Sequence, residues 1–350
     1  MGTYQYTTAV HPSLDKIKLR LSVLLVLCLA HSLSLSMSAP QNFAPGNDRH
    51  PSQYVDSPAI PTIRSSCVCG SLSVLVEGVT LHTPTADCHC PKCRKYHVAG
   101  FVSYVQVPNA SLTWVGESKA SFRDACLESG PVDRIYCSSC YTKMASLRLD
   151  GSDEVLVNLG PLEDDTIPDA IWMDWQFQRR QLQLASKAVW PTATANWEEL
   201  EFSERPSMRN VQGGCGCGAS RYQIRYHQPS ELQHCYCRLC RQLSGSAFQT
   251  WVPIQEEFFS WTTPEPQFLK TTDHGGRHVC GKCGSVMTIV YDEDDGTVWP
   301  AAGGFDDATL PPTREAMSDY LERVCHICCI WKQNWYKLPN DGNERIDKAG

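Results

Sequence analysis

The stretch that decides the fold reads Cys-His-Cys-Pro-Lys-Cys-Arg at residues 88–94 and returns as Cys-Tyr-Cys-Arg-Leu-Cys-Arg at residues 235–241. Two further cysteine pairs flank this stretch in the same order in both copies: Cys67 and Cys69 with Cys215 and Cys217, and Cys137 and Cys140 with Cys280 and Cys283. The copies are offset by 147 residues at the central stretch, by 148 before it and by 143 after it. Loop-length changes between two copies of one fold produce such a small drift, so the sequence predicts a tandem repeat.

The composition sets limits on the kind of protein this can be. A chain of 350 residues, with 42% apolar and 20% charged residues, is long enough to build two cores of ordinary size. Its formal net charge is −7, and no cluster of lysine and arginine stands out. Nucleic-acid binders normally carry a basic patch, so we expect neither nucleic acid nor an anionic membrane as the main partner.

The 19 cysteines allow two interpretations, a secreted disulfide scaffold or a reduced metal-binding protein. Disulfide-dense folds are usually short chains that cannot build a core, and this chain can. Cysteines at C-x-C and C-x-x-C spacing are poorly placed to bond each other but well placed to chelate one ion. The sequence therefore favours metal over disulfides.

Outside the repeats, the sequence indicates a disordered leader over residues 1–62, because residues 38–62 are rich in Pro, Ser, Asn and Gln. Residues 16–39 resemble a secretory signal, with an apolar run too short to span a membrane. The internal Met37 begins a stretch that reads like a cytosolic start, so we expect a cytoplasmic protein, with the secretory pathway as the alternative. The predicted parts that follow the leader are module 1 at 63–175, a linker or closing segment at 176–208, module 2 at 209–340 and a tail at 341–350.

Between the cysteines the chain reads mainly as strands, rich in Val, Ile, Tyr, Phe and Thr and bounded by Gly, Pro and Asp turns. We expect a mainly β fold of two tandem modules, with one helix at Gln178–Ala188. The predicted strands are Ser71–Val79, Phe101–Val107, Ala145–Leu149 and Val155–Leu159, then Ala219–Tyr226, Ala247–Pro253, Ser285–Tyr291 and Val298–Ala302.

Each copy contains enough thiols for a closed metal site. Four thiolates make a closed tetrahedral zinc site, and the C-x-C pair with the late C-x-x-C pair supplies them. The expected ligands are Cys67, Cys69, Cys137 and Cys140 in module 1, and Cys215, Cys217, Cys280 and Cys283 in module 2. This would give two zinc ions per module and up to four per chain, once the remaining cluster of each copy is counted.

The remaining cluster of each copy has three thiols: Cys88, Cys90 and Cys93, then Cys235, Cys237 and Cys240. Three protein ligands and one open position are typical of a catalytic zinc. Two alternatives stay open, a fourth protein ligand that closes the site and a redox-active dithiol. Cys126 has no counterpart in the second copy, and we interpret it as incidental. Cys325, Cys328 and Cys329 lie in an apolar run, and we expect buried core thiols there.

These motifs resemble the family of glutathione-dependent formaldehyde-activating enzymes and centromere protein V. The second copy carries GGCGCG, CYCRLCRQLSGSAFQTW and HVCGKCGS, and the first carries SCVCGS, CHCPKCRKYHVAGFVSY and YCSSCY. The closing segments GGFDDATLPP and HICCIWKQNWYKLPNDG are also similar, so the resemblance covers roughly residues 63 to 340. The first copy keeps the family's histidine as His89, where the second has Tyr236, and only the second keeps the Gly/Ser stretch.

The resemblance implies an Mss4-like (β-tent) fold with a structural four-cysteine zinc and a three-cysteine zinc where glutathione-linked chemistry takes place. The implied activity is a carbon–sulfur lyase of the S-(hydroxymethyl)glutathione synthase type, with a small thiol such as glutathione as partner. Arg94 and Arg241 follow the three-cysteine clusters and could meet the carboxylates of glutathione or form surface ion pairs. Two other functions compete: a non-catalytic zinc module that binds a protein partner, and a thiol redox sensor.

Overall fold

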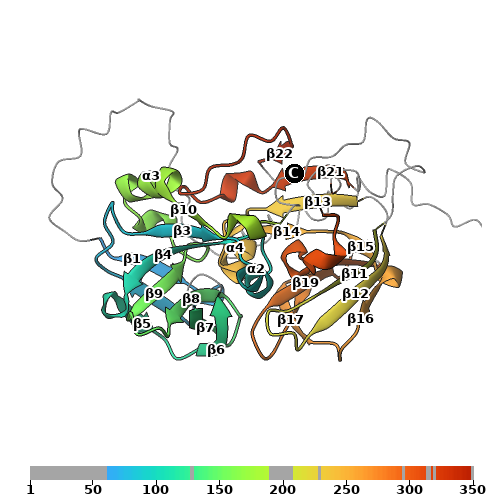
Figure 1. Ribbon diagram of the computed structural model, residues 1–350, viewed down its shortest axis with the longest axis horizontal. Helices are drawn as coiled ribbons and strands as arrows, with labels where there is room; N and C mark the ends of the chain where they lie inside the picture. The colour runs from blue at the N-terminus through green and yellow to red at the C-terminus, as the bar shows by residue number, and fades with distance from the viewer. Residues whose placement is uncertain are drawn as a thin grey trace, which may run out of the picture.

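The computed structural model describes residues 61–126, 130–188, 208–227, 230–293, 296–312, 317 and 321–347. Two β-rich modules lie side by side, and the short helices α2 and α4 lie between them (Figure 1). The prediction of a mainly β chain with two similar modules is confirmed. The predicted leader up to residue 60, its signal-like segment and the middle of the linker lie outside the described residues. None of the helices in the described part is both long and apolar enough to cross a membrane.

The first module contains a three-stranded sheet in the order β1-β2-β5 and a seven-stranded sheet in the order β10-β3-β4-β9-β8-β7-β6. All strand pairs in this module are antiparallel except the parallel pair of β10 with β3. This pair places the end of the module beside Cys88, the first residue of the three-cysteine motif. Its elements are β1 (Ile63–Ser66), β2 (Ser73–Val76), β3 (Thr85–Cys88), α2 (Pro91–His97), β4 (Val102–Pro108), β5 (Leu112–Val115), β6 (Lys119–Cys126), β7 (Gly130–Cys137), β8 (Lys143–Arg148), β9 (Glu154–Asn158), α3 (Asp169–Gln178) and β10 (Arg180–Leu182).

The second module repeats this strand order, but its large sheet is divided into β14-β13-β21-β22 and β15-β20-β19-β18-β17, beside β11-β12-β16. Proline has no backbone N–H, so Pro253 interrupts the strand that corresponds to β4 and separates β14 from β15. The elements are β11 (Met208–Gly214), β12 (Arg221–His227), β13 (Ser230–Cys235), α4 (Arg238–Ser244), β14 (Gln249–Trp251), β15 (Ile254–Gln255), β16 (Phe259–Trp261), β17 (Gln267–Thr272), β18 (Gly275–Val279), β19 (Val286–Tyr291), β20 (Thr297–Pro300), β21 (Leu321–Ile327) and β22 (Glu344–Ile346).

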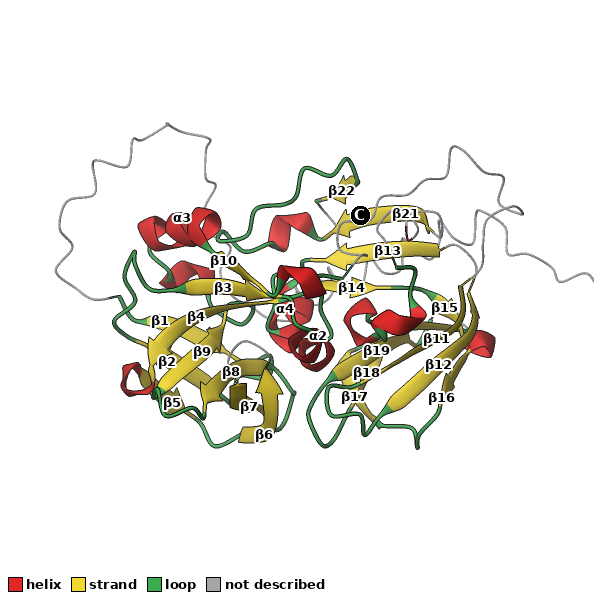
Figure 2. Cartoon of the chain, viewed as in Figure 1, coloured by secondary structure: helices red, strands yellow, loops and turns green. Residues whose placement is uncertain are grey.

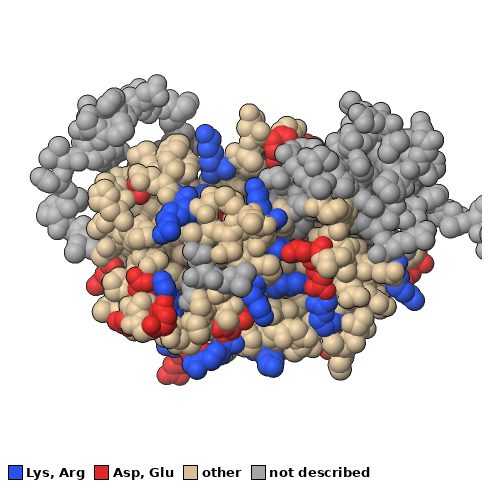
Figure 3. All heavy atoms as spheres, in the orientation of Figure 1, with Lys and Arg blue, Asp and Glu red and all other residues tan. Residues whose placement is uncertain are grey.

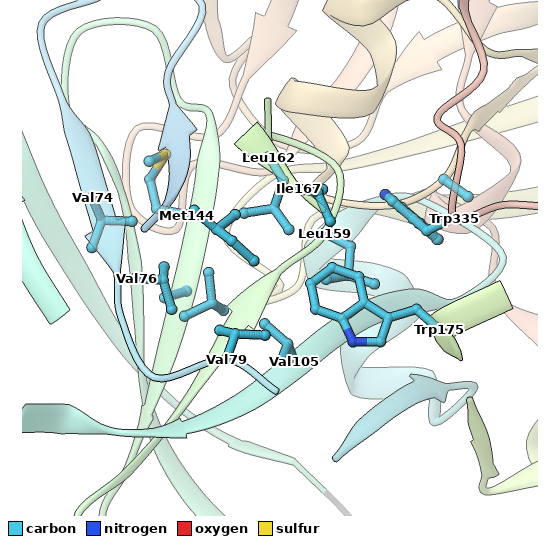
Figure 4. Close-up of a cluster of buried hydrophobic side chains, with 14 of the residues drawn as sticks. Val74, Val76, Val79, Val105, Met144, Leu159, Leu162, Ile167, Trp175 and Trp335 are labelled. Atoms are coloured by element: carbon cyan, nitrogen blue, oxygen red, sulfur yellow. The ribbon is translucent and has the colours of Figure 1, made fainter. Parts of the chain in front are cut away.

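The core of the first module includes side chains from the end of the chain. Val74, Val105 and Met144 of the sheets belong to one buried cluster with Trp175 of α3 and Trp335 of the C-terminal segment (Figure 4). All five are at most 1% exposed. Full burial of one such side chain is worth about 1.5–3 kcal/mol, so the C-terminal segment contributes substantially to a module that begins near residue 62.

The two modules also exchange side chains through their short helices. Tyr96 of α2 lies in the core of the second module, and Tyr236 and Phe248 of the second module lie in the core of the first. The backbones touch where glycine leaves room: a Cβ on Gly160 would lie 2.4 Å from the carbonyl oxygen of Arg241, and one on Gly303 would lie 2.1 Å from a backbone nitrogen of α2's C-terminal turn. Figure 2 shows both helices in this central position. The repeat thus forms an intramolecular pair with reciprocal contacts.

The structure corrects one predicted element and adds others. The helix predicted at Gln178–Ala188 is wrong, because the helix is α3, which ends at Gln178. Beyond it the chain pairs with β3 as β10, and the backbone of Gln183 is left-handed at φ 58°. Sheet pairing therefore overrides local helix propensity there. The hairpin of β6 and β7 and the helices α2 and α4 were not predicted, whereas each predicted strand contains or overlaps an observed strand.

Candidate metal centres

The two four-cysteine sets come together as expected from their spacing. In each set the four sulfurs lie within 4.8 Å of one another, and the sets are Cys67, Cys69, Cys137 and Cys140, and Cys215, Cys217, Cys280 and Cys283. The turn after each C-x-C directs a backbone N–H at sulfur, from Leu72 to Cys67 at 3.2 Å and from Ser220 to Cys215 at 3.2 Å. Such N–H groups stabilise thiolate charge. Each set could hold one metal ion.

The C-x-x-C turns have the same shape in both modules although their sequences differ. Tyr141 adopts a left-handed backbone at φ 62°, where the second module has Gly284 at φ 73°. Both donate their N–H to the carbonyl of the first cysteine of the pair, at 2.8 and 2.7 Å. A side chain in this conformation costs roughly 1–2 kcal/mol. Tyr141 stacks on Tyr136 with ring centroids 6.0 Å apart, and this contact offsets part of the strain.

The other cysteine clusters are assembled by the starts of α2 and α4. Cys88 and Cys235 end strands, and the middle cysteine caps the helix that follows. Cys90 accepts the N–H of Cys93 at 3.3 Å, and the corresponding bond in the second module is 3.5 Å long. The first helical turn returns the third cysteine toward the first two, since capping side chains face the N–H groups of that turn.

In the first module the structure adds a fourth thiol to this cluster. Cys126, at the end of β6, lies with its sulfur 3.8 Å from that of Cys90 and 3.4 Å from that of Cys93. The sulfurs of Cys88, Cys90, Cys93 and Cys126 all lie within 4.8 Å of one another. The interpretation of Cys126 as incidental is therefore wrong. It arose because the β6–β7 hairpin, which carries the thiol over the cluster, was not predicted.

In the second module the corresponding cluster consists of three cysteines. The sulfurs of Cys235, Cys237 and Cys240 lie within 4.8 Å of one another, and no fourth Cys, His, Asp or Glu in the described part of the chain joins them. Cys237 is half-buried, whereas Cys90 at the same place in the first module is 0% exposed. The two clusters thus differ both in ligand number and in contact with solvent.

A buried arginine lies beside each of these clusters, and sequence reasoning missed both. Arg134 places its terminal nitrogens 3.7 and 3.6 Å from the sulfur of Cys93, and Arg277 places one 4.0 Å from the sulfur of Cys240. Burial lowers the pKa of Arg134, but the Cys93 and Asp124 charges outweigh it and hold that pKa above its usual value. The signal was an arginine three residues before each C-x-x-C pair.

The surroundings of the two arginines differ. Arg134 also contacts the Asp124 carboxylate at 3.3 Å, whereas Arg277 donates to the hydroxyl of Thr271. In the second module the indole N–H of Trp251 donates to the sulfur of Cys240 at 3.4 Å. In the first module the Asp124 carboxylate balances part of the positive charge of Arg134. In the second module the neutral hydroxyl of Thr271 leaves the charge of Arg277 unbalanced at this contact. The second cluster is therefore held in a more positive environment.

Arg94 and Arg241 are buried between the modules. Arg94 is 2% exposed, donates to the His89 carbonyl at 3.1 Å and pairs with Asp307 of the second module. Arg241 is 7% exposed and donates to the carbonyl of Tyr236 at 3.0 Å. Their polar atoms are already engaged in this structure. The exposed arginine beside the three-cysteine cluster is Arg238, which directly follows Cys237.

The remaining cysteines and the family histidine have structural surroundings. Cys325, Cys328 and Cys329 are at most 4% exposed, which confirms the predicted burial. His89 contacts the Gln181 side chain at 2.9 Å, and the phenol of Tyr236 contacts His326 at 2.9 Å in the equivalent place. Both pairs join the cluster strand to the strand beside it. No disulfide joins any of the 18 cysteines in the described ranges.

Comparison with known proteins supports the interpretation of these clusters. Residues 62–175 and 210–323 each match the family described as glutathione-dependent formaldehyde-activating enzyme. The chain belongs to this family. The family resemblance inferred from the cysteine motifs is thereby confirmed. The chain is also similar to a Halomonas elongata protein named "Putative glutathione-dependent formaldehyde-activating enzyme". It is 32% identical over 146 residues, which is 39% of this chain and 85% of that protein, so its length corresponds to one module.

Proposed function

We propose that this protein joins glutathione to formaldehyde, or reverses that step, at a zinc ion held by Cys235, Cys237 and Cys240. The observation that carries the proposal is the three-thiol cluster of the second module: no fourth ligand in the described part of the chain joins it, and Cys237 is only partly buried. The family match and the name of the Halomonas protein support the choice of substrates. Carbon–sulfur lyase is the corresponding reaction class.

The donor set fits zinc. Thiolates are soft ligands that select zinc over magnesium or calcium, and clusters of three or four sulfurs within 4.8 Å suit its tetrahedral geometry. When bound at three thiolates, zinc supplies an open position that lowers the pKa of a thiol and polarises a carbonyl. A reducing compartment such as the cytoplasm would keep these thiols available.

The chain's own residues set the charge and orientation at the site. Three thiolates are strongly negative and would repel an incoming thiolate; Arg277 and the Trp251 N–H both face the Cys240 sulfur and reduce that repulsion. The exposed Arg238, next to Cys237, is the cation that we expect to meet a glutathione carboxylate. This replaces the sequence-based expectation for Arg94 and Arg241, whose groups are engaged between the modules.

The proposed reaction needs no oxidant or reductant. The glutathione sulfur attacks the formaldehyde carbon, so a C–S bond forms as the C=O π bond breaks. The thiol proton ends on the new hydroxyl oxygen, which gives S-(hydroxymethyl)glutathione. Positioning the two reactants together is the main contribution that a site of this kind makes.

The test is turnover by the zinc-loaded full chain, followed by NMR exchange between formaldehyde and its glutathione adduct. Cys237→Ser should abolish the catalysed exchange and remove one zinc per chain. The matched control is Lys282→Ala, an exposed residue between two cysteines of the four-cysteine set, which should keep the rate within about twofold. Catalysed exchange that survives Cys237→Ser at wild-type rate would contradict the proposal and favour a non-catalytic module.

A further inference from the structure

We propose that Cys88, Cys90, Cys93 and Cys126 form a closed four-thiolate zinc site that fastens the two modules together and admits no substrate. The inference concerns the first module alone and does not depend on the chemistry proposed for the second. It divides the repeat into a structural half and a half with an exchangeable metal.

The cluster of the first module has a complete set of zinc ligands. All four sulfurs lie within 4.8 Å of one another, and the four residues are between 0% and 6% exposed. Zinc at four thiolates has a full tetrahedral shell, which is the arrangement of structural sites. An incoming thiol would first have to displace one of these buried cysteines.

Within the described part of the chain, a longer hairpin gives the first module a fourth thiol that the second module lacks. Strands β6 and β7 each have 8 residues, whereas β17 and β18 have 6 and 5. In the longer hairpin Val132 pairs with Asp124, and the strand continues for two more residues to Cys126. Gly275 is the equivalent of Val132, because each lies two residues before the buried arginine of its module. In the shorter hairpin Gly275 already pairs with the last residue of β17. The second module therefore turns back before a residue could reach its cluster.

The charge of the metal centre in the first module would be balanced by a buried cation. A zinc ion with four thiolates has a net charge of about −2, which is costly to bury unless a cation lies beside it. Arg134 provides that cation, because it is 2% exposed and both of its terminal nitrogens lie within 3.7 Å of the Cys93 sulfur. Asp124 at 3.3 Å holds the guanidinium in place. The environment suits a permanently charged, buried metal centre.

Little space is left beside the cluster of the first module. The cavity beside Cys93 and Cys126, which His97 and Arg134 also line, has a volume of about 10 Å³. This is about the room of one water molecule, and a glutathione thiol with its carbon chain needs several times more. The first cluster is thus closed by ligand number and by packing.

The closed site would hold helix α2 in place. Helix α2 has only 7 residues, too few for an isolated helix to persist. Its N-terminal end is tied to the cluster through Cys90 and Cys93, and its other end contacts the second module. There the hydroxyl of Ser285 donates to the Tyr96 carbonyl at 3.1 Å, and Tyr96 is 0% exposed. Zinc at this cluster would therefore position the contact between the modules.

The test measures how readily zinc leaves the reduced, fully loaded full chain when a chromogenic chelator is added. Four clusters predict four ions. We expect one ion to leave fast, from the three-cysteine cluster, and three to leave slowly. Cys126→Ser should give two fast ions and raise amide hydrogen exchange over residues 91–97. Cys237→Ser should instead remove the fast ion and leave exchange at α2 unchanged.

A second measurement needs no variant. Cobalt substituted for zinc reports its ligands by its visible spectrum, and added 2-mercaptoethanol should alter the spectrum of one ion per chain. Two fast zinc ions in the wild type, or two cobalt ions that respond to the thiol, would overturn the inference even if Cys126→Ser failed to fold. A Cys126→Ser variant with a single fast ion would overturn it as well.

Discussion

Replacement of Gly303 by alanine would test the contact between the modules at its tightest point. An ideal Cβ there would lie 2.1 Å from the Ala99 nitrogen and 2.3 Å from the Val98 carbonyl carbon, both backbone atoms of the first module. An ordinary contact is at least 3.4 Å, so the backbones would have to separate by more than 1 Å. No side-chain rotation can relieve a clash between two backbones, so the modules themselves must shift.

The expected cost follows from that displacement. Overpacking in a close-packed interior typically costs about 1–3 kcal/mol, and a clash with backbone belongs at the upper end. Separation of the modules would also loosen Tyr96 in the second core and the Ser285 contact. We expect Gly303→Ala to lower the free energy of unfolding by about 3 kcal/mol. With a urea slope of about 3 kcal/mol per molar, this moves the midpoint by about 1 M.

The assay is urea unfolding of the zinc-loaded, reduced chain, followed by tryptophan fluorescence. Gly281→Ala is the matched control, because a Cβ on Gly281 meets nothing within 4 Å and its backbone is not left-handed. It should be neutral or slightly stabilising, within about 0.5 kcal/mol, as expected for Gly→Ala where the backbone permits it. If the two variants unfold at the same urea concentration, the close approach of the modules at Gly303 is refuted.

Three further predictions concern charged groups. Asp307→Asn should lower the free energy of unfolding in urea by about 1–2 kcal/mol, because it leaves the buried Arg94 guanidinium without its carboxylate. The control is Asp292→Asn, whose ion pair with Lys270 is half exposed, and it should change the free energy of unfolding by under about 0.5 kcal/mol. A loss of stability in Asp307→Asn that is no larger than that in Asp292→Asn would contradict this. Burial lowers the pKa of Lys143 to about 8, so between pH 8 and the unfolded pKa of about 10.4 the unfolded chain binds the extra proton. The stability of the wild type relative to Lys143→Met should therefore rise across that window, by at most about 3 kcal/mol, and a flat difference would show that Lys143 stays charged when folded. Arg238→Gln should raise KM for glutathione by about three- to tenfold at unchanged kcat, and an unchanged KM would remove Arg238 from the proposed site.

The sequence was a good guide to the metal clusters because ligand spacing is a local property. The pairs around Cys67 and Cys137 are far apart in the chain, yet each pair can be recognised by its C-x-C or C-x-x-C spacing. Their recurrence in the second copy indicates that both belong to one set. Cys126 could not be found in this way. It is a single cysteine at the end of a strand with many polar residues, and only the pairing of β6 with β7 places it beside Cys88, Cys90 and Cys93.

The contact between the modules was equally hidden from the sequence. Arg94 and Arg241 follow the clusters in a way that suggested ligand binding. In the structure Arg94 also pairs with Asp307 and Arg241 also donates to the Gly160 carbonyl, and both of these partners lie in the other module, more than 80 residues away in the chain. The sequence gives no sign that Gly160 and Gly303 must be glycine, because the requirement comes from the backbone of the other module. The distribution of surface charge agrees with the sequence, in which no cluster of lysine and arginine stands out. Figure 3 shows acidic and basic side chains interspersed on one face.

The C-terminal segment has a consequence for the order of events during synthesis. Trp335 and Tyr336 complete the core around Val74 and Leu159, and Gln333 donates its amide to the Leu162 carbonyl at 2.9 Å. Domains usually fold one after another as they leave the ribosome. Here the core of the first module stays incomplete until Trp335 and Tyr336 have been made. A nascent chain stalled before residue 333 would keep its N-terminal half vulnerable to proteases.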